Sequence, residues 1–290
     1  MTVRILTILL LSVLSAGCFD NAVLNDVIED LVERPTVNIA AWNIRIFSDN
    51  NRDNQELMMI ADILVGYDFI AIIEVRDERV LMRTESLLQG MGRNYDYLIS
   101  PPVGATVKER YAFLFDSEIV NVIEDGEVFP DPNDVFLREP YYATFRAGLF
   151  DFTTIATHVV YGKLVGPRQK EVQELAKVFQ AVQNADASEQ DVILLGDFNR
   201  EPKDQVAYGP LLTIPFMTYL FDLPLKSHIR DSSLYDNILF QTNYVMEYTG
   251  EHGIERFDEI DFGNDDKAAN LAVSDHRPVW AKFYANVDDD

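Results

Sequence analysis

Acidic, amide and imidazole side chains occur in this sequence where short apolar runs end. The residues placed in this way are Asn43, Glu74, His158, Asp197, Asn199, Asp236, Asp275 and His276. Carboxylate and amide oxygens are the ligands of hard cations such as Mg²⁺, and histidine exchanges protons near neutral pH. This combination of residue types is suited to metal-assisted acid–base chemistry.

Each of these residues has an ordinary structural explanation when it is taken alone. An aspartate after a glycine commonly caps a turn, and a glutamate at a strand end is commonly solvated. Strand ends of a layered fold gather on one rim, however, so we expect the set to share one cleft. His228 and His252 lie in polar stretches and are predicted to be exposed. The single cysteine and the excess of oxygen ligands argue against zinc.

The elements that must position these residues alternate between β-rich and helical patterns from Thr36 onward. No linker or repeat divides them, which predicts one domain over residues 36–290. The predicted strands are 37–42, 69–73, 95–100, 111–115, 120–123, 141–145, 150–157, 192–195, 237–240, 245–248 and 279–283. The predicted helices are 55–65, 79–91 and 168–183. Because hairpins and crossovers are mixed, we expect an α/β fold with two sheets packed face to face and helices outside.

The charge balance restricts how a polyanionic substrate is bound. The chain has 290 residues, of which 24 are Lys or Arg and 48 are Asp or Glu, so its formal net charge is -24. This excludes a broad basic face of the kind that binds nucleic acid by counterion release. A polyanion must therefore be held locally, by a few cations or by a metal ion.

Residues 1–17 have the pattern of a short signal peptide. An apolar run, residues 5–14, is followed by Ser15-Ala16-Gly17-Cys18. Small residues before a lone cysteine resemble a bacterial lipobox, which implies lipidation of Cys18, and ordinary secretion with cleavage nearby is the alternative. Residues 18–35 are predicted to form a tether or an amphipathic helix. Both alternatives place the protein outside the cytoplasm, as a membrane-anchored lipoprotein or a secreted protein.

A series of short motifs, taken in chain order, resembles the endonuclease/exonuclease/phosphatase family, and most closely its secreted deoxyribonuclease I branch. The motifs are Ala41-Trp42-Asn43-Ile44, Glu74-Val75-Arg76-Asp77, Lys108-Glu109-Arg110-Tyr111, Arg138-Glu139-Pro140, Thr157-His158, Gly196-Asp197-Phe198-Asn199, Tyr235-Asp236 and Ser274-Asp275-His276-Arg277-Pro278. The resemblance covers residues 37–284. The resemblance implies a four-layered α/β sandwich, in agreement with the strand and helix pattern.

The resemblance also implies metal and substrate ligands. Asn43 and Glu74 would be the main Mg²⁺ ligands, with Asp275 at or beside a second metal position and Mn²⁺ or Ca²⁺ as additional candidates. Arg76 and Arg138 would contact DNA, where arginine is a strong charge-assisted donor. Taken without the motifs, each arginine is explained equally well as a surface salt-bridge partner.

The catalytic residues that the resemblance implies are Glu109, His158, Asp197, Asn199, Asp236 and His276. Glu109 would pair with His158 and Asp236 with His276, so that each carboxylate fixes the imidazole tautomer and favours its charged form. The Asp-Phe-Asn motif would orient the attacking water and hold the phosphate. The sequence leaves open which histidine protonates the leaving oxygen.

Departures from the family pattern concern the substrate rather than the chemistry. Val107 stands where deoxyribonuclease I has a tyrosine that enters the minor groove, and Asn237 replaces an arginine. The family disulfides cannot form, so the loop 126–133 must be held otherwise or be mobile. The acidic stretches 258–266 and 288–290 are predicted to be exposed. These changes weaken the inference of double-stranded DNA and leave the proton-transfer groups intact.

Three functions follow from these observations. The first is an extracytoplasmic, divalent-metal-dependent endonuclease that acts on DNA and leaves 5′-phosphate and 3′-hydroxyl ends. The second is a phosphodiesterase or phosphatase for phospholipids or inositol phosphates, which would need an apolar loop near the cleft; residues 208–225 are the nearest candidate, but predict a packed loop and helix. The third is a noncatalytic surface protein that keeps the fold. No protein partner is inferred.

Overall fold

Two six-stranded β-sheets form the centre of this computed structural model, which describes residues 35–187 and 189–288. The predicted signal peptide 1–17, Cys18 and all of the predicted tether except Pro35 lie outside the described residues. No helix in the described part of the chain has the length and apolar character needed to cross a bilayer.

The first sheet has the strand order β11-β12-β1-β2-β4-β3. Its strands are β1 (Thr36–Phe47), β2 (Phe69–Val75), β3 (Tyr95–Ile99), β4 (Arg110–Asp116), β11 (Tyr248–Ile254) and β12 (Val279–Tyr284). Strands β1 and β2 pair in parallel through the crossover helix α3 (Asn54–Leu64), and the other pairs are antiparallel. Helix α3 begins with a capping box, in which Asp53 and Glu56 bond each other's backbone N–H groups.

The second sheet has the order β5-β6-β7-β8-β10-β9 and repeats this plan. Its strands are β5 (Val120–Val128), β6 (Tyr141–Ala147), β7 (Phe150–His158), β8 (Val192–Asp197), β9 (Met217–Tyr219) and β10 (Asp236–Gln241). Here the parallel pair is β7 and β8, joined through α5 (Val165–Gln183), and the remaining pairs are antiparallel. Each sheet therefore contains one βαβ unit, and each unit ends in polar residues.

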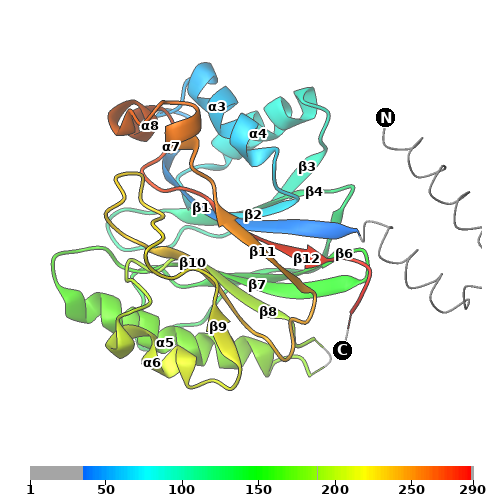
Figure 1. Cartoon of the computed structure of the whole chain (residues 1–290), viewed down its shortest axis with the longest axis vertical. Helices are drawn as coiled ribbons and strands as arrows, with labels where there is room; N and C mark the ends of the chain where they lie inside the picture. The colour runs from blue at the N-terminus through cyan, green and yellow to red at the C-terminus, as the bar shows by residue number, and fades with distance from the viewer. Residues whose placement is uncertain (1–34, 188, 289–290) are drawn as a thin grey trace, which may run out of the picture. The chain divides into compact units, whose positions relative to one another are not determined.

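Three apolar clusters separate four layers (Figure 1). The cluster between the sheets is rich in aromatic rings, with Phe69 and Phe145 centroids 4.8 Å apart. Helices α3, α4 (Glu78–Gly90), α7 (Phe257–Ile260) and α8 (Asp266–Ala272) cover the first sheet, and α5 and α6 (Gln205–Leu212) cover the second. The predicted four-layered α/β sandwich is confirmed.

The C-terminal third is where individual elements differ from the prediction. The strand predicted at 245–248 is wrong: Val245 is buried in a turn, because its N–H bonds the Gln241 carbonyl, and strand β11 starts at Tyr248. The stretch 208–225 contains most of α6 and all of β9, and its side chains Tyr208, Leu211 and Phe221 are fully buried. These three residues serve the core, whereas Phe216, Leu223 and Leu225 of the same stretch are exposed.

Candidate active site

The predicted polar residues meet at a cavity of about 530 Å³ at the ends of the two βαβ units. It is lined by the predicted residues Asn43, Glu74, Arg76, Arg138, His158, Asp197, Asn199, Asp275 and His276, together with Arg45, Ile46, Tyr161, His228, Ser232, Ser233 and Tyr235. Glu109 and Asp236 are buried and contact the two histidines. The structure thus brings together every site residue that the sequence indicated within the domain.

Glu74 is placed by an irregularity in β2. The β1–β2 and β2–β4 registers both shift beside it, and its φ of +67° is in the left-handed region, which is strained for a non-glycine residue. The carboxylate accepts hydrogen bonds from the Ile46 N–H and the Arg76 guanidinium, both at 3.0 Å. Burial raises the pKa of Glu74, but His158, the Ile46 amide and Arg76 together outweigh it and lower that pKa. Glu74 is therefore ionised at neutral pH.

Asn43 presents an amide oxygen without a protein partner. Its side chain is 2% exposed, and its Nδ2 donates to Asp197 Oδ2 at 3.0 Å. Its backbone carbonyl accepts from Ser274 Oγ at 2.6 Å, while its Oδ1 is buried and has no hydrogen bond within the described part of the chain. A buried acceptor left free needs a ligand. Together with the Glu74 carboxylate, this oxygen fits a hard divalent cation.

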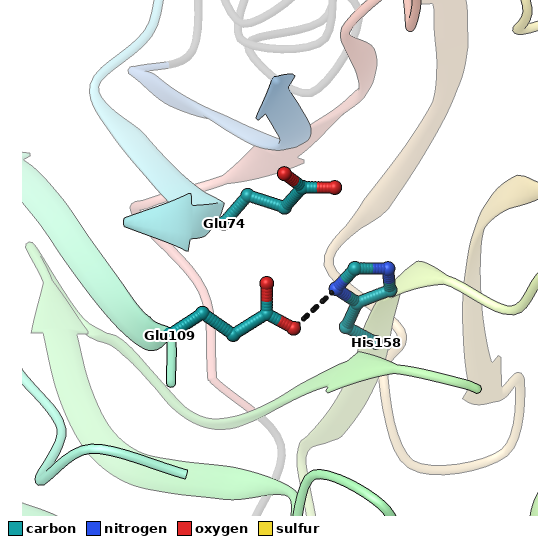
Figure 2. A group of neighbouring side chains, drawn as sticks. All are labelled: Glu74, Glu109 and His158. Atoms are coloured by element: carbon teal, nitrogen blue, oxygen red, sulfur yellow. Dashed lines mark ion pairs between the residues drawn. The ribbon is translucent and has the colours of Figure 1, made fainter. Parts of the chain in front are cut away.

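His158 is the last residue of β7 and forms the first carboxylate–imidazole pair (Figure 2). Its Nδ1 lies 2.9 Å from Glu109 Oε1, and its Nε2 lies 3.7 Å from Asp197 Oδ2. The Arg138 and Arg76 guanidinium groups also pair with Glu109. Burial and the Arg138 charge outweigh the carboxylates and lower the pKa of His158 to about 4. This imidazole is neutral at pH 7.

Gly196, which precedes Asp197, allows β7 and β8 to approach closely beside His158. Its φ is +133°, and a Cβ at this position would lie 2.2 Å from the Thr157 carbonyl oxygen. Only glycine fits this position. The close approach places Asp197 opposite His158 in the parallel register.

His276 forms the second pair and has the opposite charge state. Its Nδ1 lies 2.8 Å from Asp236 Oδ2, and its Nε2 lies 3.8 Å from Asp197 Oδ2. Burial lowers the pKa of His276, but the charges of Asp236 and Asp197 outweigh it and raise that pKa well above the usual value. The imidazolium form of His276 is therefore favoured, and the two histidines lie beside Asp197 with pKa values shifted in opposite directions.

Each histidine also belongs to a compact group of metal-ligating atoms. Glu74, Glu109 and His158 form one group and Asp197, Asp236 and His276 the other, and within each group the ligand atoms lie within 4.8 Å of one another. The residues around the cavity are therefore suited to holding a divalent metal ion.

The segment that carries His276 is held by a buried arginine. Arg277 is 1% exposed, and it donates to both carboxylate oxygens of Asp258 at 2.7 and 2.6 Å and to Asp231 at 2.6 Å. Asp258 was predicted to lie in an exposed acidic loop, and this is wrong because it begins the buried side of α7 and neutralises Arg277. A short helix with a single buried turn has too little periodicity to be recognised from sequence.

One further expectation changes at the cavity, and one departure from the family pattern is explained. His228 was predicted to be exposed, but it is half-buried, lines the cavity and lies 5.8 Å from the His276 ring. Asn237 is 1% exposed and bonds the Phe221 backbone through both its amide nitrogen and its oxygen. Asn237 therefore supports the structure and does not face the cavity.

Sequence reasoning missed the buried glutamate Glu171, which is 3% exposed on α5. Its two oxygens accept from the backbone N–H groups of Leu137 and Val160, at 2.9 and 2.8 Å. A charged residue next to Val172 on the apolar face of a helix was the available signal. Glu171 thereby ties the Arg138 segment to the segment that follows His158.

Known deoxyribonucleases are similar to this chain in sequence. No family model matches the chain. Deoxyribonuclease-1 from Canis lupus familiaris is 30% identical over 260 residues, which cover 83% of this chain and 89% of that protein. The chain belongs to the deoxyribonuclease I family. A deoxyribonuclease from Thioalkalivibrio sp., 29% identical over 267 residues, covers 86% of this chain and 71% of its own length. The family predicted from the motifs is confirmed.

Solved structures show the same fold at lower identity. The catalytic domain of human nocturnin is 15% identical, with a TM-score of 0.60, and the match covers 87% of this chain and 95% of that chain. An endonuclease/exonuclease/phosphatase family protein from Bacteroides thetaiotaomicron, also 15% identical, has a TM-score of 0.56 over 89% of this chain and all of the other. The deoxyribonuclease I family member described here therefore has the layered fold of this wider group.

Proposed function

We propose that the protein is an extracytoplasmic, divalent-metal-dependent endonuclease that hydrolyses DNA to 5′-phosphate and 3′-hydroxyl ends. One observation carries the proposal: His158 Nε2 and His276 Nε2 lie 3.7 and 3.8 Å from the same oxygen, Asp197 Oδ2, at one cavity. Hydrolysis at phosphorus needs a base for the attacking water and an acid for the leaving oxygen, and two imidazoles at one cavity can supply both. The deoxyribonucleases to which the chain is similar support DNA as the substrate.

Asn43 and Glu74 would hold the metal ion, with Asp275 beside them at the same cavity. The oxygen-only ligand set favours Mg²⁺ over softer metals. A bound divalent ion would supply charge stabilisation to the phosphoryl oxygens. The free Asn43 oxygen and the ionised Glu74 are the observations that support this assignment.

The proton transfers follow from the charge states of the two histidines. His158, whose Nδ1 is held by Glu109, presents its Nε2 to the cavity and accepts a proton from the attacking water. Asp197 and Asn199 orient that water. As the water oxygen bonds to phosphorus, the bond from phosphorus to O3′ breaks, and the His276 imidazolium donates its proton to the leaving O3′. Arg76 and Arg138 bind the flanking phosphates in this scheme.

The test is plasmid nicking by the purified full-length chain across a Mg²⁺ series. We expect nicking that depends on Mg²⁺ and is abolished by EDTA, and 5′ ends that a polynucleotide kinase labels only after phosphatase treatment. Glu74→Gln should raise the Mg²⁺ concentration needed for half-maximal rate by at least about tenfold, because a charged ligand is lost. Cleavage undiminished in EDTA would remove the metal from the proposal.

The location is a separate part of the proposal and rests on the sequence pattern of residues 1–18. Expression of the full chain and of Cys18→Ser in a bacterial host tests it by membrane fractionation. Lipidation predicts that the wild type sediments with membranes and that Cys18→Ser is released. Equal release of both proteins to the medium would favour ordinary secretion, and retention of both in the cytoplasm would contradict both alternatives.

A further inference from the structure

Tyr161 is an exposed aromatic residue at the rim of the catalytic cavity. Its side chain is 71% exposed, although it lines the same cavity as Glu74 and His276. It makes no hydrogen bond or ring contact with any other residue in the described ranges 35–187 and 189–288. An aromatic ring without a packing role next to a reaction centre offers both of its faces to a ligand.

The loop beneath this ring is firmly anchored. The Val159 N–H donates to the Asp197 carbonyl at 2.9 Å, and the Val159 carbonyl accepts from Asn199 Nδ2 at 2.8 Å. The Val160 N–H donates to Glu171 at 2.8 Å. Tyr161 therefore stands on a stem that is bonded directly to the Asp-Phe-Asn motif, and its position relative to the reacting phosphate is set by the same groups that set the catalytic residues.

The anchor also fixes the ring relative to a phosphate-binding cation. Glu171 bonds the Leu137 N–H through its other oxygen at 2.9 Å, and Leu137 precedes Arg138. A guanidinium for a phosphate and an aromatic face for a base are thus held by one buried carboxylate. Arg138 and Tyr161 both line the cavity, and a cation with an aromatic ring is the combination that binds single-stranded nucleic acid.

The negative charge of the protein makes a stacking contact important for binding DNA. The net charge is -24, and Arg76 and Arg138 are already paired with Glu109. Stacking does not depend on net charge and is tolerant of base identity. Inside an intact duplex both faces of a base are covered by its neighbours, so away from the duplex ends an unpaired nucleotide is needed to stack on a protein ring.

We propose that Tyr161 binds an unpaired nucleobase beside the scissile phosphate, which makes single-stranded or frayed DNA the preferred substrate class. This inference rests on the proposed nuclease function. It assigns a substrate-binding role to a residue that takes no part in the proton transfers.

The first test compares wild type, Tyr161→Ala and Tyr161→Phe on a single-stranded oligonucleotide, with Leu164→Ala as the matched control. Leu164 is 73% exposed in the same loop and does not line the cavity. We expect Tyr161→Ala to raise KM about tenfold and to leave kcat within about twofold, because stacking is worth this much per base. Tyr161→Phe and Leu164→Ala should keep the wild-type KM. Equal KM values for wild type and Tyr161→Ala, or a Tyr161→Phe variant as weak as Tyr161→Ala, would overturn the proposal.

The second test locates the base. Thymidine oligonucleotides with one abasic residue at successive positions are bound in EDTA, and the Kd is measured by fluorescence anisotropy. At one position the abasic residue removes the base that stacks on Tyr161. There the affinity of the wild type should fall to that of Tyr161→Ala, whose affinity should not change. Binding in EDTA does not depend on catalysis, so a protein that binds with this pattern and fails to cleave contradicts the proposed function alone. Equal sensitivity of both proteins at every position contradicts the role of Tyr161 alone.

Discussion

The His158 and His276 regions are built from the same parts and end in opposite charge states. In each, a carboxylate contacts Nδ1 and Nε2 points toward Asp197 Oδ2, at 3.7 Å in one case and 3.8 Å in the other. The difference lies beyond the pair. Arg76 and Arg138 surround the partner of His158, whereas His276 has additional carboxylates around it. The comparison shows that the pKa of a histidine depends on its carboxylate partner and also on the charged residues around that carboxylate.

The two regions are also positioned by different means. His158 ends a strand that pairs with β6 and β8, and its N–H donates to the buried Tyr111 hydroxyl. His276 lies outside the named strands and is held by side chains, since its carbonyl accepts from Trp42 Nε1 at 2.7 Å and Arg277 anchors the next position. A sheet ladder positions His158, whereas one isolated bridge to His228 together with polar side-chain contacts positions His276.

The largest expected effect comes from removing either imidazole. His158→Ala and His276→Ala should each lower kcat by about 10²-fold to 10⁴-fold, because each removes a positioned proton-transfer group. His252→Ala is the matched control, since His252 is exposed and does not line the cavity. Steady-state kinetics on an oligonucleotide measure all three. A near-normal rate for either site variant would end its assignment to the mechanism.

Asp258→Asn tests whether the Arg277–Asp258 ion pair holds the segment that carries His276. Breaking a buried ion pair by neutralising one partner should destabilise the fold by about 3–5 kcal/mol. For a domain of this size the melting temperature should fall by about 6–20 °C, as measured by calorimetry. The loss should be greater than that of Asp222→Asn, a surface control. Unchanged melting would show that the Arg277 pair does not hold the His276 segment.

The charge states predict two opposite shifts in the pH profile of kcat/KM. Activity should fall at low pH as His158 is protonated near its pKa of about 4, and at high pH as His276 loses its proton. Arg138→Gln removes a cation and raises the pKa of His158, so the acidic limb should move up by about one pH unit. Asp236→Asn removes an anion and lowers the pKa of His276, so the alkaline limb should move down. Shifts in the reverse directions would exchange the roles of base and acid.

The smallest expected effects come from two variants that each remove one hydrogen-bond acceptor, one beside His158 and one beside the Asp236–His276 pair. Tyr111→Phe removes the acceptor of the His158 N–H, and Ser227→Ala removes the acceptor of the Tyr235 and Asp236 N–H groups. Each should cost about 1–3 kcal/mol of stability in denaturant titrations. Tyr111→Phe should leave kcat nearly unchanged because β7 still positions His158. Ser227→Ala should lower kcat several-fold. Equal kcat values for the two variants would show that His158 and His276 do not differ in how they are positioned.

Features that arise from local sequence patterns could be predicted, whereas features that depend on contacts between distant residues could not. Apolar periodicity located most strands and the three long helices, and strand-end polar residues such as Glu74 and His158 located the cavity. Short elements such as α7 lack a full period, so Asp258 was assigned to the surface. Its pairing with Arg277 joins residues 19 positions apart and has no local signal. The unequal protonation of the two histidines depends on arginines that only the fold brings close.

The order of strands in the first sheet has a consequence for folding. Strand β12 lies between β11 and β1, and the Ser274 hydroxyl and the His276 carbonyl bond Asn43 and Trp42 near the start of the domain. Strand β1 therefore lacks one of its two neighbours until residues 279–284 have paired with it. The cavity is complete only when residues 231 and 234 positions apart in the sequence have come together.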